Sequence, residues 1–254
     1  MSQFYIHPKR KTKVVFVQLG SPSEPTTKAL RKYLRKFLGD PRVVDINPWL
    51  WKLILNFFVL PFRPSKSAKL YARIWDGENF PLITNTRDFT KNVSDELKKI
   101  DPEGYVEVNH AFLLSPPYVN EVYDSWEEDL KKGIGATKLL VIPMFPQYSE
   151  STIASGIDAL AKELSKRVKI PTFEVITNFH RTHAFIDNSV CQVDKKLDEL
   201  LNQGKKIDNL IITFHGMQKR RIVNKGDDYY RHCYETFCLI TNKLKNIKPD
   251  QCMM

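Results

Sequence analysis

A regular alternation of two residue patterns runs along this chain. Short runs of β-branched and aliphatic residues are separated by longer segments with helical periodicity. The runs predict strands at Lys13–Leu19, Tyr105–Leu113, Lys138–Phe145, Thr172–Thr177 and Ile207–Thr213. The longer segments predict helices over Thr86–Ile100, Val119–Gly133, Ser151–Arg167, Thr182–Asn202 and Asp228–Asn246. This order is typical of an α/β protein with a mostly parallel sheet.

The first strand and the helix after it are the clearest pair. Lys13–Leu19 reads KVVFVQL, the pattern of a strand that is buried on both faces. Ser23 or Glu24 is expected near the helix cap, with Pro25 in the first turn. Five residues at helical spacing are expected to face the core: Leu30, Tyr33, Leu34, Phe37 and Leu38.

Composition narrows the classes of protein and of partner. The 254 residues carry a formal charge of +10, which favours an anionic partner such as nucleic acid, acidic lipid, or a small polycarboxylate or phosphate. The sequence contains no Walker A, GxGxxG or HExxH motif, so the usual nucleotide-binding enzymes are disfavoured. The four cysteines form no CxxC pair, and neither a secretory h-region nor an apolar run of the roughly 20 residues that span a membrane is found. A cytoplasmic protein is expected.

An aromatic run from Trp49 to Phe62 has three interpretations. It is nearly all apolar, so it predicts a buried helix, a flap over a flat aromatic ligand, or a patch that rests on a membrane face. Nearby Arg63, Lys66 and Lys69 would suit a ligand that carries carboxylates. Periodicity alone does not choose among these.

Two loops that follow predicted strands carry polar side chains. Phe145–Thr152 contains Gln147 and Tyr148, and is either an ordinary Ser/Thr helix cap or a ligand loop at the carboxyl end of a strand. His215 follows the last strand, Ile207–Thr213, which is expected to be buried, and is either a structural histidine or a group that ligates a metal or accepts a proton. His180 and His183 have loose metal-ligand spacing, which is a weak signal without a nearby cysteine or carboxylate pattern.

In their order, the motifs resemble those of the ferrochelatases, the enzymes that insert ferrous iron into a porphyrin. The matching motifs are Leu19-Gly20-Ser21-Pro22, Asp40-Pro41-Arg42-Val43-Val44, Leu60–Ala68 with Tyr71 and Ile74-Trp75, Pro146-Gln147-Tyr148-Ser149 with Ser151-Thr152, and Phe214-His215-Gly216-Met217 with Lys225-Gly226-Asp227 and Glu235-Thr236. Their order covers nearly the whole chain and is far more specific than any one of them.

The resemblance implies two similar Rossmann-like halves with parallel sheets flanked by helices, and a porphyrin cleft between them. Residues 1–178 would form the first half, with Trp49–Phe62 as a lip, and residues 179–254 a connecting helix and the start of an incomplete second half. Leu19, Arg63, Tyr71, Gln147 and Tyr148 would contact the porphyrin. His215 would be the iron ligand or the acceptor of the pyrrole protons, and imidazole suits both roles.

The resemblance also sets the expected partners. These are protoporphyrin IX and Fe²⁺, the latter as a substrate, with no tightly bound cofactor, no iron–sulfur cluster and no nucleic acid. Peripheral contact of Trp49–Phe62 with the inner face of a membrane is expected, and a complementary C-terminal chain could supply the rest of the second half.

Three departures from the family pattern leave alternatives open. Ala111–Pro116 lacks the usual Arg-Tyr pair, Phe80 stands where the family often has Ser, and the chain stops where the family continues. The alternatives are a non-catalytic porphyrin- or haem-binding relative, one half of a split enzyme, and a class II cobalt or nickel chelatase of another tetrapyrrole. From the last departure we expect little chelatase activity from the 254 residues alone.

Overall fold

The computed structural model describes residues 11–254, so most of the N-terminal stretch in which no signal peptide was found lies outside it. The described chain divides into two compact units. The first takes the described residues up to Met144 together with Glu150–Ile176, and the second takes Phe145–Ser149 and Thr177–Met254. The short segment Phe145–Ser149 therefore packs with residues that follow it by about 30 positions or more in the chain.

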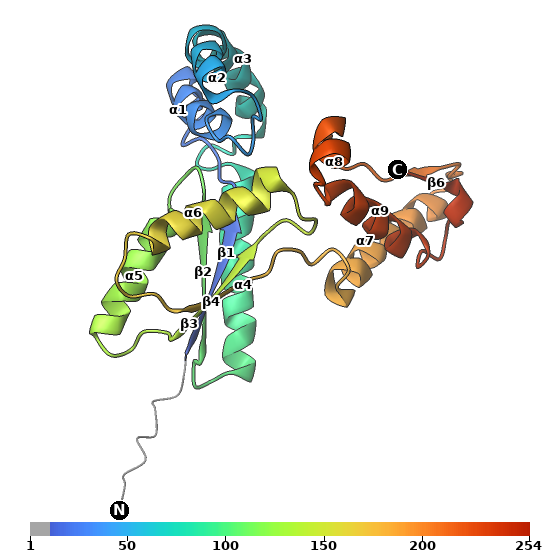
Figure 1. The fold of residues 1–254 in the computed structure, drawn as a ribbon. Helices are drawn as coiled ribbons and strands as arrows, with labels where there is room; N and C mark the ends of the chain where they lie inside the picture. Colours follow the sequence, from blue (N-terminus) through green and yellow to red (C-terminus); the bar gives the residue numbers. More distant parts are fainter. Residues whose placement is uncertain (1–10) are drawn as a thin grey trace, which may run out of the picture. The chain divides into compact units, whose positions relative to one another are not determined.

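A four-stranded parallel sheet organises the first unit (Figure 1). Its order is β2 (Val106–Phe112), β1 (Thr12–Gln18), β3 (Lys138–Pro143) and β4 (Thr172–Val175). β1 lies in the middle, paired with β2 from Thr12–Val106 to Gln18–Phe112 and with β3 on its other side. The α/β class and the four strands predicted here are confirmed, and every strand end lies within two residues of the prediction.

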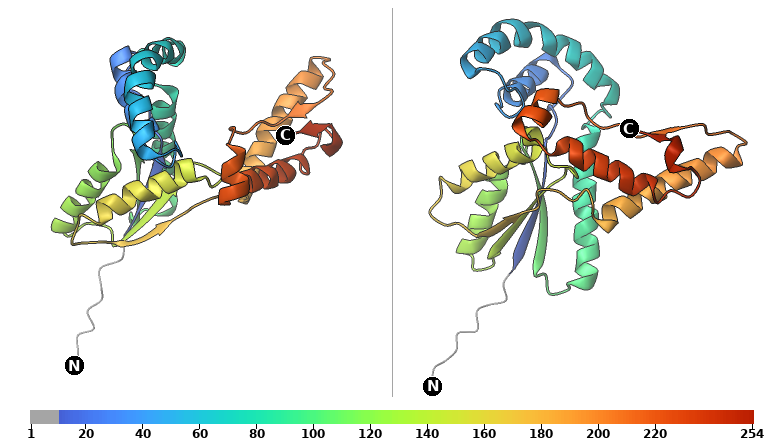
Figure 2. Two further views of the ribbon diagram at one scale, coloured as in Figure 1. Left: turned by 45° about the horizontal axis from the view of Figure 1, so that its top comes forward. Right: turned by 45° about the vertical axis from the view of Figure 1, so that its right-hand side comes forward.

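Successive residues of β1 face opposite layers of helices, because strand side chains alternate. Val15 and Val17 pack with Tyr123 and Trp126 of α5 (Val119–Lys131) and with α6 (Ser155–Leu164). Phe16 faces the other way and meets Phe89 of α4 (Pro81–Ile100), with ring centroids 5.1 Å apart. Figures 1 and 2 show α4 on one face of the sheet and the α5–α6 pair on the other.

The first helix begins later than predicted. α1 spans Thr27–Leu38, and its N-cap is Thr26, whose Oγ1 accepts a hydrogen bond of 3.2 Å from the Ala29 N–H. Ser23 and Glu24 are therefore not the cap, and Pro25 precedes the helix rather than lying in its first turn. Thr26 is the cap because it lies three residues before Ala29, whose N–H has no partner within the helix, and a side-chain oxygen at this position caps a helix.

The Trp49–Phe62 run forms a bent helical segment beyond the carboxyl ends of the strands. It consists of α2 (Pro48–Ile54), a π turn η1 (Leu55–Val59) and the start of α3 (Leu60–Tyr71), which is followed by the short 3₁₀ helix η2 (Ala72–Ile74). The α3 helix contains Pro64, which leaves the Leu60 carbonyl without its helical donor. Arg31 of α1 donates to that carbonyl through Nε at 3.2 Å, so a side chain replaces the lost backbone bond.

The second unit is built on two long helices and a small sheet of its own. Its elements are α7 (His183–Asn202), β5 (Leu210–Ile211), α8 (Lys219–Lys225), α9 (Tyr229–Thr241), η4 (Pro249–Gln251) and β6 (Cys252–Met253). Ile186 and Val190 of α7 pack against Ile240 of α9. β5 and β6 pair in parallel.

The predicted buried strand Ile207–Thr213 is wrong in length and in burial. Only Leu210 and Ile211 are in β5, and Ile211 is 63% exposed. Its one partner among the described residues, β6, also has two residues and was not predicted, since Cys252-Met253 is too short to show a pattern. A two-residue ladder leaves most of this segment outside the sheet.

Three further helix boundaries differ from the prediction. α4 begins at Pro81 rather than at Thr86. The last long helix ends at Thr241, not Asn246, and α6 is preceded by a π turn η3 (Glu150–Ala154). Of the helices within residues 11–254, none has both the length and the apolar composition needed to cross a membrane.

Candidate functional site

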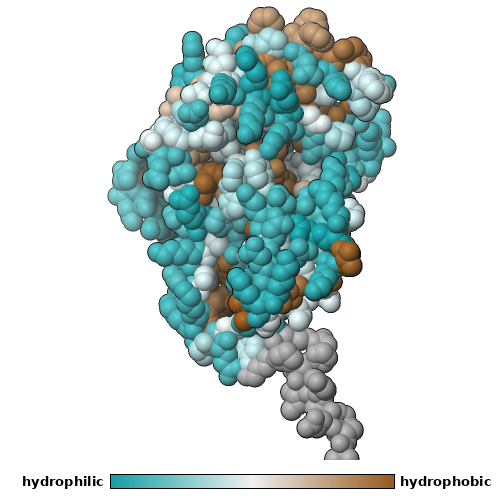
Figure 3. All heavy atoms as spheres, turned by 90° about the vertical axis from the view of Figure 1, so that its left-hand side faces the viewer, coloured by the Kyte–Doolittle hydropathy of each residue, from teal (hydrophilic) through white to brown (hydrophobic). Residues whose placement is uncertain are grey.

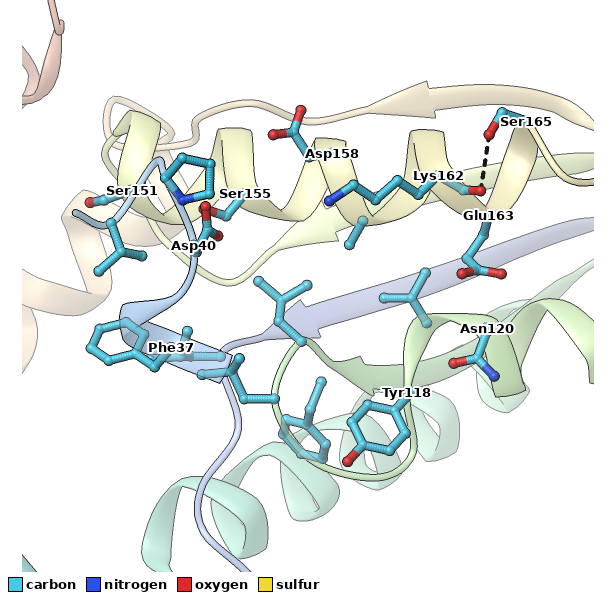
Figure 4. A pocket seen from close by; sticks show the side chains of 18 of the residues that line it. Phe37, Asp40, Tyr118, Asn120, Ser151, Ser155, Asp158, Lys162, Glu163 and Ser165 are labelled. Carbon is cyan, nitrogen blue, oxygen red and sulfur yellow. Dashed lines mark hydrogen bonds between the residues drawn. The ribbon is translucent and has the colours of Figure 1, made fainter. Parts of the chain in front are cut away.

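A cavity of about 420 Å³ in the first unit lies at the carboxyl ends of the strands. Its floor is formed by the residue after β1, the end of β2 and the loop that follows β2 (Figure 4). Its walls are formed by the end of α1, the start of α5 and one side of α6. Ligands of parallel α/β sheets bind at this edge. Of the six predicted site residues, Leu19 lines this cavity, half-buried.

The cavity has an apolar floor and a charged rim. The floor is made by Leu19, Phe112, Leu113 and Leu114. Phe112 is fully buried, and the half-buried Leu113 and Leu114 give apolar surface in the stretch where the family's arginine is absent. The rim carries both signs of charge, and Figure 4 shows Asp158, Lys162 and Glu163 following one another along α6.

Two polar groups at the rim are unusual: the carboxyl of Asp158 has a lowered pKa, and the buried hydroxyl of Ser155 lacks a hydrogen-bond partner among the described residues. Asp158 accepts hydrogen bonds of 2.5 and 3.0 Å from Arg42, which hold the pKa of that carboxyl below its usual range. Ser155 is 8% exposed, and its Oγ has no hydrogen-bond partner among the described residues. A buried hydroxyl without a partner is costly, and a bound polar group would satisfy it.

Gly20 allows the loops after β1 and β2 to pack closely beside this cavity. Its φ of +92° lies in the left-handed region, and a Cβ there would collide with Ser115 Oγ and lie 3.0 Å from Phe112 Cβ. The Ser115 Oγ in turn accepts a hydrogen bond of 3.3 Å from the Ser21 N–H. Gly20 therefore lets the β1 and β2 loops pack directly on each other beside Leu19.

A second cavity of the first unit, of about 300 Å³, has a different chemistry. It is bordered by Ser21, Lys32, Arg87 and Ser115, with Trp75 and Phe80 as aromatic walls. None of the described residues that line it is acidic. Two cations and several hydroxyls without an opposing carboxylate favour an anionic group.

Arg63 and Tyr71 both lie on α3, but in different surroundings. Arg63 is exposed. Tyr71 is half-buried, and its ring meets Phe80 at 5.4 Å and Tyr33 at 6.3 Å between centroids. Neither residue lines the 420 Å³ or the 300 Å³ cavity. Their roles toward a porphyrin remain predictions.

The α2–η1–α3 segment exposes large apolar side chains to an unusual extent. Trp49 is 79% exposed, and Phe57, Phe58 and Phe62 are each 67 or 68% exposed. In Figure 3, apolar surface gathers at the top of the view, over the helices α1–α3. The interpretation of this run as a buried helix is therefore wrong, and a surface that contacts a ligand or a membrane remains.

In the second unit, Gln147 and Tyr148 are held against α9. The Gln147 Nε2 donates to Thr236 Oγ1 at 3.1 Å, and the Tyr148 backbone N–H donates to His232 Nδ1, also at 3.1 Å. Thr236 was part of the sequence motif, whereas His232 was missed. The only signal for it was its place one helical turn before Thr236 on a predicted helix.

His215 lies in the loop between β5 and α8, with an exposed side chain. Its backbone N–H donates to Tyr229 Oη at 3.1 Å, which fixes the main chain and leaves the ring accessible. Burial is the main reason why the pKa of Tyr229 rises to about 12, so its hydroxyl stays protonated. The expectation that His215 follows a buried strand is wrong, while its role as a metal ligand or base stays a prediction.

The His180–His183 spacing does not produce a metal site. His180 is 2% exposed and pairs with Glu235, whereas His183 is exposed on α7. Within residues 11–254, no three His, Cys, Asp or Glu side chains gather in a way that could hold a metal ion.

Comparison with known proteins identifies the class to which this fold and these motifs belong. The ferrochelatase family model matches residues 11–254. A ferrochelatase of Idiomarina loihiensis is 38% identical over 234 residues, which are 92% of this chain and 61% of the relative. Ferrochelatases of Francisella tularensis subsp. tularensis and Marinobacter nauticus are 34 and 35% identical, over 98 and 94% of this chain and 71 and 62% of theirs. The chain belongs to the ferrochelatase family and spans about two thirds of the length of these relatives.

Proposed function

We propose that the protein carrying this chain inserts Fe²⁺ into protoporphyrin IX to form protohaem. The observation that supports this most is the family match over residues 11–254, which includes the Phe214-His215-Gly216-Met217 loop with its accessible imidazole. Both iron and porphyrin are substrates. In the reaction Fe²⁺ replaces two pyrrole N–H protons, so one metal enters the ring and two protons leave.

His215 acts at the metal side of this reaction. An imidazole near neutral pH takes up a proton readily and is also a good ligand for borderline Fe²⁺. Because its ring is exposed, a proton that it accepts passes on to water. The hydrogen bond from its backbone to Tyr229 keeps the loop in place while the ring changes its protonation state.

The first unit supplies surfaces that suit a flat, apolar dianion. Half-buried apolar residues such as Leu19 and Leu113 match the macrocycle, and Arg63 pairs with a propionate. Tyr71 gives an aromatic wall that its contact with Phe80 holds in place. Gln147 and Tyr148 are the other two residues that we propose to contact the porphyrin.

Membrane contact through the α2–η1–α3 segment fits the same activity. Its exposed aromatic side chains are accompanied by four exposed cations, a combination that favours an anionic lipid surface: Lys52, Arg63, Lys66 and Lys69. A porphyrin partitions into such a surface, so the segment would lie where the substrate is. We place the protein at the cytoplasmic face, in keeping with four cysteines that are all free thiols.

The test is an insertion assay on the purified protein with His215→Ala, followed by the fluorescence of zinc protoporphyrin and, anaerobically, by the absorbance of haem. We expect His215→Ala to lower turnover by at least about 100-fold. His183→Ala is the matched control, since His183 is an exposed histidine of the same unit outside the proposed site.

Each other outcome has a meaning. Full turnover in His215→Ala would remove His215 from the mechanism. Porphyrin binding without insertion by the unaltered protein would favour a binding relative or one half of a split enzyme. Faster insertion of cobalt or nickel into another tetrapyrrole would favour the second kind of chelatase.

A further inference from the structure

The segment Phe145–Ser149 is attached to the second unit by hydrogen bonds from two directions. The Phe179 N–H donates to the Pro146 carbonyl at 3.0 Å, and Gln147 Nε2 donates to Thr236 Oγ1 at 3.1 Å. The third bond runs from the Tyr148 N–H to the ring nitrogen Nδ1 of His232, at 3.1 Å. Of the three, only this last bond has an acceptor that titrates.

The protonation state of His232 decides whether that bond exists. A backbone N–H can only donate, so Nδ1 must carry no proton when it accepts. The imidazolium carries a proton on both nitrogens, and would therefore point an N–H at the Tyr148 N–H. Protonation of this one ring converts a hydrogen bond into a contact between two donors.

The surroundings of His232 disfavour its charged form. The residue is 4% exposed, and its ring is stacked on that of His180 with centroids 3.9 Å and planes 18° apart. A neutral ring that accepts at Nδ1 carries its proton on Nε2, so Arg231 Nη2, 3.1 Å from Nε2, is a neighbouring cationic donor and not a hydrogen-bond donor to the ring. Burial, then His180 and Arg231, lower the pKa of His232 below its ordinary value, against the smaller opposing effects of Asp228 and Glu235.

His180 is fixed as the stacking partner by Glu235. The Nε2 of His180 lies 2.8 Å from Glu235 Oε2, and the same carboxylate is paired with Arg231 at 2.9 Å and lies 3.9 Å from Arg181. The hydrogen bond with His180 is the main reason why the pKa of Glu235 is lowered. The charged and titratable groups that face His232 are thus His180, Arg231, Asp228 and Glu235, and the last two remain ionised through the range in which His232 titrates.

We propose that His232 is a positioning residue: its neutral ring holds the backbone of Tyr148, next to Gln147, in place, and its protonation loosens this part of the segment. The part of this inference that concerns the porphyrin rests on the proposed function, in which these two residues contact the substrate. The part that concerns the segment itself does not, because it follows from the hydrogen bonds within the second unit.

The sign of the pH dependence follows from the direction of the shift. A histidine with a lowered pKa in the folded protein binds fewer protons there than in the released state, so the held state is fully stable above the ordinary histidine pKa of about 6.5. Its stability falls as the pH drops through that value. The segment should be held at pH 7.5 and loosened at pH 5.5.

The direct test needs no substrate. Nitrogen-15 spectroscopy of the histidine rings at pH 7.5 should show His232 Nδ1 unprotonated, and the Tyr148 amide resonance should titrate together with this ring. The protection of the Tyr148 amide from hydrogen exchange, corrected for the intrinsic effect of pH, should fall about fivefold between pH 7.5 and 5.5, as expected for the loss of one hydrogen bond. A protonated Nδ1 at pH 7.5, or an amide that does not respond, overturns the proposal even if no variant folds.

Two variants separate positioning from mere packing. In His232→Gln, the side-chain amide oxygen still accepts from Tyr148 but does not titrate, so the protection should persist at pH 5.5. His232→Leu removes the acceptor, so the Tyr148 amide should be weakly protected at both pH values. Equal pH responses in the unaltered protein and His232→Gln would refute the role of the ring, and His183→Gln is the matched control on an exposed histidine.

Porphyrin affinity gives the second readout. Between pH 7.5 and 5.5, the porphyrin affinity of the unaltered protein should weaken about fivefold more than that of His232→Gln. Protonation of the porphyrin affects both proteins equally, so it does not contribute to this difference. If the amide responds as expected but neither protein binds porphyrin, the proposed function fails and the positioning role stands. If porphyrin binds but the amide does not respond, the positioning role fails and the proposed function stands.

Discussion

Gly20→Ala should destabilise the first unit by about 2–4 kcal/mol. An alanine at the left-handed φ of +92° costs about 1–2 kcal/mol, and the collision of its Cβ with Ser115 Oγ and Phe112 Cβ adds about 1–3 kcal/mol. The lower entropy of the unfolded alanine chain returns about 0.4–1 kcal/mol. Gly77→Ala separates these effects, because Gly77 also has a positive φ, +103°, but within residues 11–254 no atom beyond its two chain neighbours lies within 4 Å of its new Cβ.

Urea unfolding followed by tryptophan fluorescence is the assay. All four tryptophans, Trp49, Trp51, Trp75 and Trp126, belong to the first unit, so the signal reports on that unit alone. With an m-value of about 2–3 kcal/mol/M, the midpoint should shift by about 1 M for Gly20→Ala and clearly less for Gly77→Ala. Equal shifts for the two would refute the steric part of the reasoning.

A double-mutant cycle with Ser115→Ala tests the contact itself. Ser115→Ala alone should cost about 1 kcal/mol, since it removes the acceptor of the Ser21 N–H. It also removes the oxygen that the new Cβ would meet, so the double variant should be more stable than the sum of the two changes by about 1 kcal/mol. The Phe112 contact at 3.0 Å remains, which keeps the relief partial. Simple additivity would show that Ser115 is not the neighbour that matters.

Two further predictions concern the helices at the carboxyl end of the sheet. Arg63→Ala should weaken protoporphyrin binding about tenfold, the lower end for the loss of a charge-assisted hydrogen bond, because Arg63 is exposed. Lys91→Ala, which removes an exposed cation of α4, is the control. Equal protoporphyrin affinities of Arg63→Ala and the unaltered protein in a fluorescence titration would remove Arg63 from the site. Replacing both Phe57 and Phe58 by serine should reduce co-sedimentation with phosphatidylglycerol vesicles at least about tenfold at unchanged stability, whereas unchanged sedimentation would refute the membrane contact.

The sheet of the first unit was predictable because its strands carry their own signal. Val14–Val17 is apolar on both faces, and the structure buries it under helices on both sides, so the local pattern and the tertiary environment agree. Lys13 is the exception within this strand. Its side chain is 1% exposed, and Nζ lies 3.4 Å from Glu107 and 3.6 Å from Asp129. No local sequence pattern predicts these two partners, because they are distant in the sequence.

The second unit was less predictable because its small sheet depends on partners rather than on pattern. Ile207–Thr213 reads as a strand, yet only two of its residues pair, and their partner is Cys252-Met253. The same reason explains why His232 was missed. Its significance comes from Tyr148, which lies 84 positions away, and from the stack on His180.

The aromatic run shows most clearly why periodicity could not decide between burial and exposure. The run and the part of α3 that follows it bury Leu55, Leu60, Pro64 and Ala68, which are spaced by five, four and four residues. The first, longer step crosses the π turn, whose extra residue keeps Leu60 on the buried stripe of the segment. The opposite stripe is apolar as well, so hydropathy gives no contrast between the two faces. Without that contrast, only the bonds that orient the segment distinguish the stripes: Arg31 Nε to the Leu60 carbonyl, and Trp51 Nε1 to the Leu38 carbonyl at 2.6 Å. Both bonds join it to α1, so the face turned to α1 is buried and the remaining aromatic side chains are left for a ligand or a lipid surface.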